Sequence, residues 1–244
     1  SKMKGLNLDE KFCALKEFAS DDIADALMKL NVPYGGFLPD IVMYGPERQA
    51  GNTKLIGPAY TIKTVLRTDT TSPRPKQHFA DAAPPGSVVF VSVPPNTVNA
   101  AWGGLMTARV KAKGANGIVV DGRIRDLAEI REEGIPAFAK GTSSLSAKDF
   151  IRPTALNHPV TLNGNYDPPI VIRPGDIIFG DLDGVICIPR RLLDTVIEMC
   201  KVNKKIDAGL KEQVKKGISL VEIFAMYRIK WAKDDDDHPA SWGS

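Results

Sequence analysis

Hydrophobic residues recur at two different periods along the first half of the chain. Helical spacing at Phe12, Leu15 and Phe18, followed by an N-cap at Ser20, predicts two helices between residues 9 and 30. Beyond them, short apolar runs alternate with segments of helical period. We expect strands at 59–66, 88–93, 117–120 and 136–139, and helices at 78–83, 104–113 and 126–133. This alternation of strand and helix indicates an α/β core with a largely parallel sheet.

The second half of the chain has shorter apolar runs joined by turns. Strands at 159–162, 169–172, 176–179 and 184–188 predict a meander or small barrel, and two helices, 190–208 and 219–231, should close the chain. The acidic run at 234–237 predicts a solvated tail. No apolar run approaches the roughly 20 residues that cross a bilayer, so we expect no membrane-spanning segment. Without an internal repeat or a linker, one domain is the better interpretation.

Composition narrows the function classes. The chain has 244 residues, with 32 Lys and Arg against 29 Asp and Glu, a net charge of +3. This balance disfavours a partner that is a polyanion, so we expect no nucleic-acid partner. The three cysteines, Cys13, Cys187 and Cys200, are widely spaced and predict reduced thiols. With no secretory signal visible, we expect a cytoplasmic protein.

One segment, 102–129, carries the most chemical information. Gly103 and Gly104 precede a predicted helix, whose first free N–H groups, on Leu105 and Met106, would form a site for a carboxylate or phosphate. About 20 residues later a strand ends near Arg125 and Asp126. Loops beyond the carboxyl ends of parallel strands collect ligands. In such a loop, Arg125 could bind a carboxylate or enolate oxygen. Asp126, next to it, offers the hard oxygen ligand that Mg²⁺ or Mn²⁺ prefers.

Purely structural interpretations of the same residues compete with this functional one. Glycine pairs before helices are common, and Asp126 is also a good first residue for the helix that follows it. Asp121 could support the site or form a turn before Gly122, and Arg123 could assist the anion pocket or point outward. The remaining candidates favour structural roles: three isolated histidines, one basic helix face and one acidic turn too short to encircle calcium. These are His78, His158, His238; Arg109, Lys111, Lys113; Asp181 and Asp183.

The spacing Gly104, twenty residues, Arg125-Asp126, two residues, Glu129 resembles the Gly-x20-Arg-Asp-x2-Glu/Asp motif of the RraA-like family. That family includes the class II 4-hydroxy-4-methyl-2-oxoglutarate aldolases, which also decarboxylate oxaloacetate. Further landmarks lie at 56–61, 103–106, 122–126, 174–176 and 180–184. The resemblance covers roughly residues 20 to 217, with residues 1–19 an N-terminal extension with a helix and 218–244 a C-terminal helix and acidic tail. It is closest to the fungal branch.

The resemblance implies a single compact α/β domain of the swivelling β/β/α type, with helices packed on a mixed sheet. It also implies a homotrimer or a dimer of trimers, with active sites between subunits. Asp126 would bind the metal, Mg²⁺ or Mn²⁺, and Arg125 would hold the pyruvyl oxygen. The backbone at Gly104, Leu105 and Met106 would hold the substrate carboxylate.

Four further residues receive roles from the resemblance or from their places in the sequence. Glu129, Asp121 and Arg123 would lie near the site without contacting the metal. A neighbouring subunit's C-terminal helix would supply a carboxylate, which the count back from Gly217 assigns to Asp207.

The function so implied is a divalent-metal-dependent lyase that releases pyruvate from small 2-oxo dicarboxylates through an enolate. Many relatives carry an acidic residue where this chain has Gly104, so we expect oxaloacetate decarboxylation to exceed aldol cleavage. One alternative is a non-catalytic regulator that binds an RNA-processing enzyme; such binders lack the metal-binding Asp that this chain keeps at Asp126. Another is a related lyase with a specialised oxo-acid substrate.

Overall fold

The computed structural model describes residues 7–223 and 225. Its internal contacts divide the chain into two compact units, residues 1–200 and 201–244. The predicted division at residues 19 and 217 stays a prediction. Each unit is described by itself.

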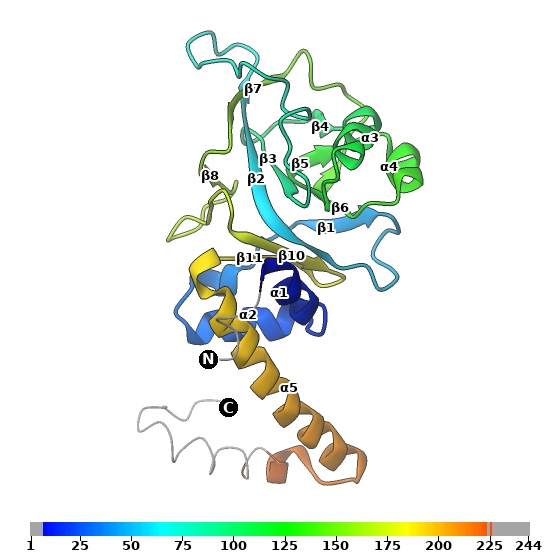
Figure 1. Cartoon of the computed structure of the whole chain (residues 1–244), viewed down its shortest axis with the longest axis vertical. Coiled ribbons are helices and arrows are strands. Elements are labelled where there is room, and N and C mark those ends of the chain that lie inside the picture. Colours follow the sequence, from blue (N-terminus) through cyan, green and yellow to red (C-terminus); the bar gives the residue numbers. More distant parts are fainter. Residues whose placement is uncertain (1–6, 224, 226–244) are drawn as a thin grey trace. The chain divides into compact units, whose positions relative to one another are not determined.

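A mixed sheet of nine strands forms the framework of the first unit (Figure 1). Its members are β1 (Val42–Gly45), β2 (Leu55–Leu66), β3 (Val88–Ser92), β4 (Ala100–Trp102), β5 (Gly117–Ile124), β6 (Ala137–Thr142), β7 (Ile151–Leu156), β10 (Ile177–Asp181) and β11 (Gly184–Ile188). The order is β1-β6-β5-β3-β2-β10-β11, with β4 on β5 and β7 on β2. The ladders β2–β3, β3–β5 and β5–β6 are parallel, so the carboxyl ends of these strands share one edge.

The sheet curves into a nearly closed barrel around an apolar interior. Side chains from β1, β2, β3, β5, β6, β10 and β11 meet there, with Phe90, Phe138 and Val119 fully buried. A separate two-stranded ladder, β8 (Val160–Thr161) with β9 (Val171–Ile172), adds Val160 and Ile172 to the same core. This architecture confirms the expected α/β fold with helices on a mixed sheet.

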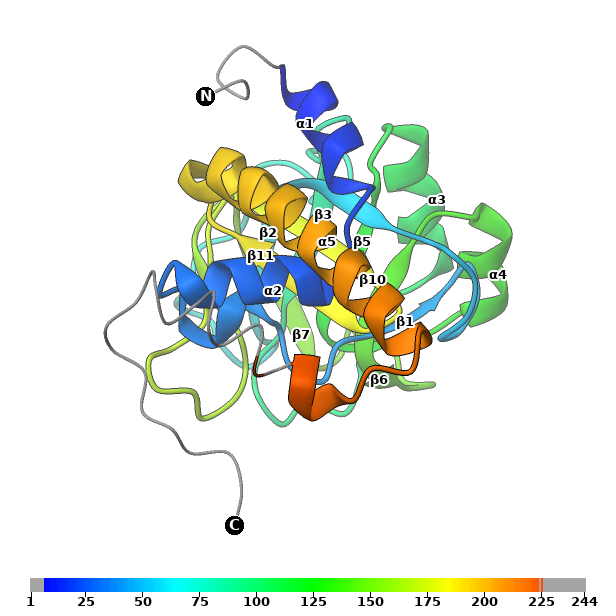
Figure 2. The same cartoon turned by 90° about the horizontal axis from the view of Figure 1, so that it is seen from below.

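Helices cover the outside of the barrel in two groups. The helices α3 (Gly104–Ala112) and α4 (Leu127–Glu133) pack on β3, β5 and β6 through Val110 and Ile130. The helix α2 (Ser20–Lys29) and the first turns of α5 (Leu193–Lys215) cover β10 and β11 (Figure 2), and α1 (Leu8–Leu15) packs beside them on β2. Two 3₁₀ turns, Pro33–Gly36 and Arg190–Leu192, precede β1 and α5.

Several sequence predictions are wrong in detail. The helix expected at 78–83 is a turn, because Pro84 and Pro85 lack the N–H groups that would extend it. The strand expected to end at 120 continues to Ile124, where it gains pairing with β4. The strand expected to end at 139 continues to Thr142. The late strands do not form their own barrel, since β10 pairs with β2 and joins the main sheet.

The second unit contains the rest of α5, from Lys201 to Lys215, and the start of a further helix. Ser219 accepts a hydrogen bond from the Glu222 N–H, as an N-cap does. The predicted helix at 219–231 is thus begun, but residues 224 and 226–231 and the acidic run at 234–237 lie outside the described residues. Within the described ranges, no helix has the length and apolar character to cross a membrane.

Candidate active site

The end of β5 places the arginine and aspartate of the motif. The Arg125 N–H donates to the Trp102 carbonyl at 3.0 Å, which ties the end of β5 to the segment before Gly103. Asp126 follows as the N-cap of α4, in the left-handed conformation with φ 59° and ψ 45°. A non-glycine residue in this region carries strain that packing must hold, and such positions cluster at functional sites.

The two glycines lie directly against the motif carboxylates. The Gly104 N–H donates to Asp126 Oδ2 at 3.1 Å. A Cβ built on Gly103 would overlap the same oxygen, and one built on Gly104 would lie 2.8 Å from Glu129 Cδ and overlap its carboxylate. A side chain at position 104 would also meet Glu129 Cβ at 2.6 Å, so the close approach requires glycine there, whereas at position 103 only the end of the Asp126 side chain would have to shift. The contact joins the start of α3 to the start of α4 across 22 residues of sequence.

Charges of both signs meet at this point. Arg125 Nε lies 3.6 Å from Asp126 Oδ2, and the side chains keep 41% and 35% of their exposure, so solvent or a ligand can reach both. The first turn of α3 contributes N–H groups and the positive end of its dipole. Leu105, 75% exposed, and the half-buried Met106 follow Gly104 in that turn. The arrangement suits a small anion held beside a cation ligand.

A cavity of about 500 Å³ opens at the site. It is lined by 124–127 and by 142–144. The sequence does not predict the hydroxyl residues Thr142, Ser143 and Ser144 as part of the site, because its pattern ends this strand at residue 139, three residues before the end of β6. The signal that could have found them is the Thr-Ser-Ser run at the end of the fourth parallel strand. Ser143 is held in place by its N–H, which donates to the Ile124 carbonyl at 3.0 Å.

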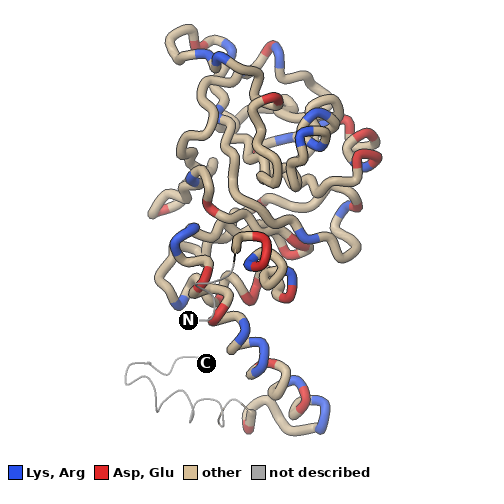
Figure 3. Tube along the Cα trace, viewed as in Figure 1, with Lys and Arg blue, Asp and Glu red and all other residues tan. Residues whose placement is uncertain are grey.

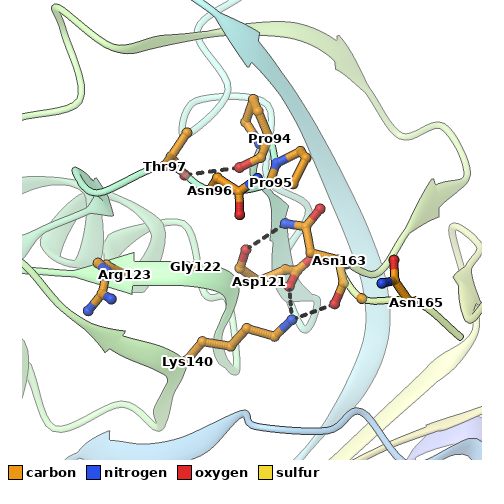
Figure 4. Close-up of a pocket in the computed structure, with 11 residues that line it drawn as sticks. Pro94, Pro95, Asn96, Thr97, Asp121, Gly122, Arg123, Lys140, Asn163 and Asn165 are labelled. Atoms are coloured by element: carbon orange, nitrogen blue, oxygen red, sulfur yellow. Dashed lines mark hydrogen bonds and ion pairs between the residues drawn. The ribbon is translucent and has the colours of Figure 1, made fainter.

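Three predicted residues are not among those that line this cavity. Asp121 and Arg123 line a second cavity (Figure 4), although Arg123 also donates to the carbonyl of Thr142, which lines the first one. Asp207 belongs to the second unit, on α5, so its role stays a prediction. Sites for a metal with three or more His, Cys, Asp or Glu side chains are not found among the described residues.

The residues set aside in the sequence have local partners. Asp181 accepts hydrogen bonds from the Ser20 N–H and hydroxyl at 2.8 and 2.7 Å, which is a structural role rather than calcium binding. His78 Nδ1 accepts from the Ala80 N–H at 3.3 Å. Burial raises the pKa of the Cys200 thiol to about 12, so that thiol stays protonated. Basic and acidic residues are interspersed along the described trace (Figure 3).

The profile of the RraA-like family, described as Aldolase/RraA, matches residues 21–187, more than half of the chain. The chain therefore belongs to the RraA-like family. Proteins of this family include aldolases and RraA regulators, and the motif residues described above lie within the matched segment.

Individual relatives fit this assignment. Protein DlpA of Legionella pneumophila is 32% identical over 80% of this chain, which spans only 29% of DlpA. A Halalkalibacterium halodurans protein provisionally named 4-hydroxy-4-methyl-2-oxoglutarate aldolase is 27% identical over 71% of this chain and 78% of its own length.

Two solved structures share the fold. An uncharacterized protein from Pseudomonas syringae has a TM-score of 0.72 and 24% identity, covering 88% of this chain and 96% of its own. Streptomyces coelicolor RraAS2, described as an unusual member of the RNase ES inhibitor RraA family, also has a TM-score of 0.72 and 24% identity, covering 84% and 98%. These likenesses support the fold alone.

Proposed function

We propose that this protein is a divalent-metal-dependent lyase that releases pyruvate from small 2-oxo dicarboxylates. The observation that carries the proposal is the contact of the Gly104 N–H with Asp126 Oδ2, with Arg125 beside it in an open cavity. The substrates we propose are oxaloacetate, which loses CO₂, and 4-hydroxy-4-methyl-2-oxoglutarate, which undergoes retro-aldol cleavage. The aldolase name of one relative supports the reaction class.

The donor set fits a hard divalent cation. Asp126 and Glu129 offer carboxylate oxygens against the same pair of glycines, and no histidine or cysteine is among the residues that line the cavity. Mg²⁺ is usually held by one or two carboxylates, with waters and substrate oxygens completing its shell. Asp126 would hold the ion, and the ion would supply Lewis-acid stabilisation of charge on the 2-oxo oxygen.

The chain's own residues would bind the substrate and balance its charge. The N–H groups of Leu105 and Met106, at the start of α3, would hold the carboxylate next to the 2-oxo group. The Arg125 guanidinium would donate to the oxo oxygen as the C3–C4 bond breaks and its electron pair forms the enolate. Protonation at C3 then gives pyruvate. Retro-aldol cleavage also needs a base for the 4-hydroxyl, whereas decarboxylation needs none.

We also propose that the active protein is a homotrimer or a dimer of trimers. Two exposed apolar side chains lie by the site, Leu105 at its anion end and Leu145 next to the cavity residue Ser144. In such an assembly a neighbouring subunit would cover these two leucines. Light scattering on the full chain after size exclusion measures the assembly, and a monomeric mass would contradict the proposal.

A lactate-dehydrogenase-coupled assay on oxaloacetate tests the function. Pyruvate formation should require Mg²⁺, stop with EDTA and fall at least about a hundredfold in Arg125→Ala. The matched control is Arg109→Ala, on α3, where the arginine pairs with exposed Asp81 at 2.6 Å and faces another region. Activity that survives both chelation and Arg125→Ala would overturn the mechanism.

A further inference from the structure

A second cavity, of about 490 Å³, opens at the mouth of the barrel (Figure 4). It is lined by 94–97 after β3, by 121–123 on β5, by Lys140 on β6, and by 163–165 after β8. None of these residues lines the cavity at Arg125 and Asp126, so the two are separate places on the molecule. Barrel mouths are frequent ligand sites.

A buried ion pair forms the floor of this cavity. The Asp121 side chain is fully buried, and its Oδ1 lies 2.7 Å from Lys140 Nζ. Lys140 also donates to the Asn163 carbonyl at 2.8 Å, and the Asn163 N–H donates to Asp121 Oδ2 at 2.7 Å. The adjacent inward positions on the same two strands, Val119 and Phe138, are apolar and fully buried.

This change from apolar to charged side chains has a physical cost. Replacing a buried ion pair by packed apolar residues is often neutral or stabilising, so stability alone does not explain charges at this level of the barrel. Asp121, Lys140 and Asn163 are joined in one hydrogen-bonded network, and such a network forms a preorganised polar surface. The floor of the cavity therefore has the properties of a binding surface.

The chemistry of the lining defines the ligand. Lys140 and Arg123 against Asp121 leave one net positive charge, which suits a single carboxylate. Arg123 lies along β5 at the edge of the cavity, where it donates to the Thr142 carbonyl at 3.0 Å. The amides of Asn96 and Asn165 are suited to hydroxyl groups. Asn163 and Thr97 donate their own protons to the Val93 and Pro94 carbonyls, at 2.6 and 3.0 Å, so each offers its side-chain oxygen as an acceptor. Only two prolines offer apolar contact, so an alkyl chain would gain little.

We propose that the barrel mouth binds a small polyhydroxylated monocarboxylate, a sugar acid, at a site separate from Arg125 and Asp126. Its carboxylate would pair with Lys140, on the side of that ammonium group away from Asp121, and its hydroxyls would bond the asparagine amides. The proposal is independent of the lyase function, because it uses none of the same residues.

Calorimetric titration of the full chain tests it, in buffer with EDTA so that metal binding by the ligand does not contribute. The three probes each have six carbons. Gluconate carries both the carboxylate and the hydroxyls, hexanoate carries only the carboxylate, and glucitol carries only the hydroxyls. Gluconate should bind saturably and at least about tenfold more tightly than either of the others. Equal binding of hexanoate or glucitol, or no saturable binding of gluconate, would overturn the proposal.

Variants then locate the site. Lys140→Met should weaken gluconate binding about ten- to a hundredfold, since it removes a charge-assisted hydrogen bond. Arg125→Met, the matched change in the other cavity, should leave the affinity within about twofold. Asn165→Ala, at an exposed position, serves if Lys140→Met does not fold, and it should weaken binding severalfold. Unchanged affinity in the folded cavity variants, or loss in Arg125→Met, would contradict the assignment.

Discussion

Glu129 places its carboxylate where a side chain on residue 104 would lie. A Cβ on Gly104 would be 2.6 Å from Glu129 Cβ and 2.8 Å from its Cδ. The glycine in the motif and the acidic residue 25 positions later are thus two parts of one arrangement. A carboxylate is present against Gly104, but it comes from α4 and not from the start of α3.

This arrangement bears on the preferred reaction. Decarboxylation of oxaloacetate is expected to exceed aldol cleavage, because it needs no base for a hydroxyl and position 104 supplies no carboxylate of its own. The check is a comparison of both substrates with Mg²⁺ on one preparation of enzyme. Faster aldol turnover would show that another group, with Glu129 as the first candidate, provides the base.

A substitution of Glu129 tests whether this carboxylate acts as a base or instead supports metal binding or folding. If aldol turnover is the faster reaction and Glu129 supplies its base, Glu129→Gln should lower aldol cleavage about ten- to a hundredfold while decarboxylation changes less, since general-base assistance contributes on that order or more. Glu132→Gln, an exposed neighbour on α4, is the control and should match the parent enzyme. An equal loss of both reactions would point to metal binding or folding rather than to base catalysis.

The ion pair at the barrel mouth predicts a pH dependence of stability. Burial raises the pKa of Asp121 from 3.8 to about 6, against the opposing effect of Lys140 and the Asn163 N–H. Because the folded protein holds this proton more tightly than the unfolded chain, the group favours folding below about pH 4. That contribution is lost as pH rises to about 6.

Urea unfolding at several pH values, compared with Asp121→Asn, measures this effect. Between about pH 4 and pH 6, the unfolding free energy of the parent protein should fall by roughly 1–3 kcal/mol relative to that of the variant. Parallel pH profiles would show that Asp121 does not titrate in this range.

A buried arginine predicts a large stability effect away from both cavities. Arg152 is 3% exposed and donates to three carbonyls of the proline-rich loop, those of Asp69, Ser72 and Pro73, at 2.7–3.1 Å. Arg152→Met should lower the unfolding free energy by about 2–4 kcal/mol, because these carbonyls lose their charged partner. It should also speed protease cleavage in the loop at 67–76.

The comparison for Arg152→Met is Arg67→Met, at an exposed position beside the same loop. Its stability should stay within about 0.5 kcal/mol of the parent. Similar losses in both variants would mean that the loop responds to net charge and not to the buried guanidinium.

The elements that carry the candidate site could be predicted from the sequence because they are local. The strand before Arg125 and the helix after Gly104 have clear periods, and parallel order brings their ends to one edge. The elements that could not be predicted depend on pairing between segments that are distant in the sequence. The strand β1 forms by pairing with β6, β7 forms by pairing with β2, and the last residues of β5 become a strand by pairing with β4. The left-handed Asp126 and the meeting of Gly104 with Glu129 likewise arise only when α3 and α4 pack together.

The anion end of the proposed active site is built from main chain. The N–H groups that would hold the substrate belong to Leu105 and Met106, whose side chains do not define them. Alanine-scanning mutagenesis, which changes one side chain at a time, would therefore not detect these contacts. Natural substitutions at these two positions would leave the N–H groups in place. Replacing single amide bonds by esters, which deletes one donor without altering a side chain, is the substitution that would expose them.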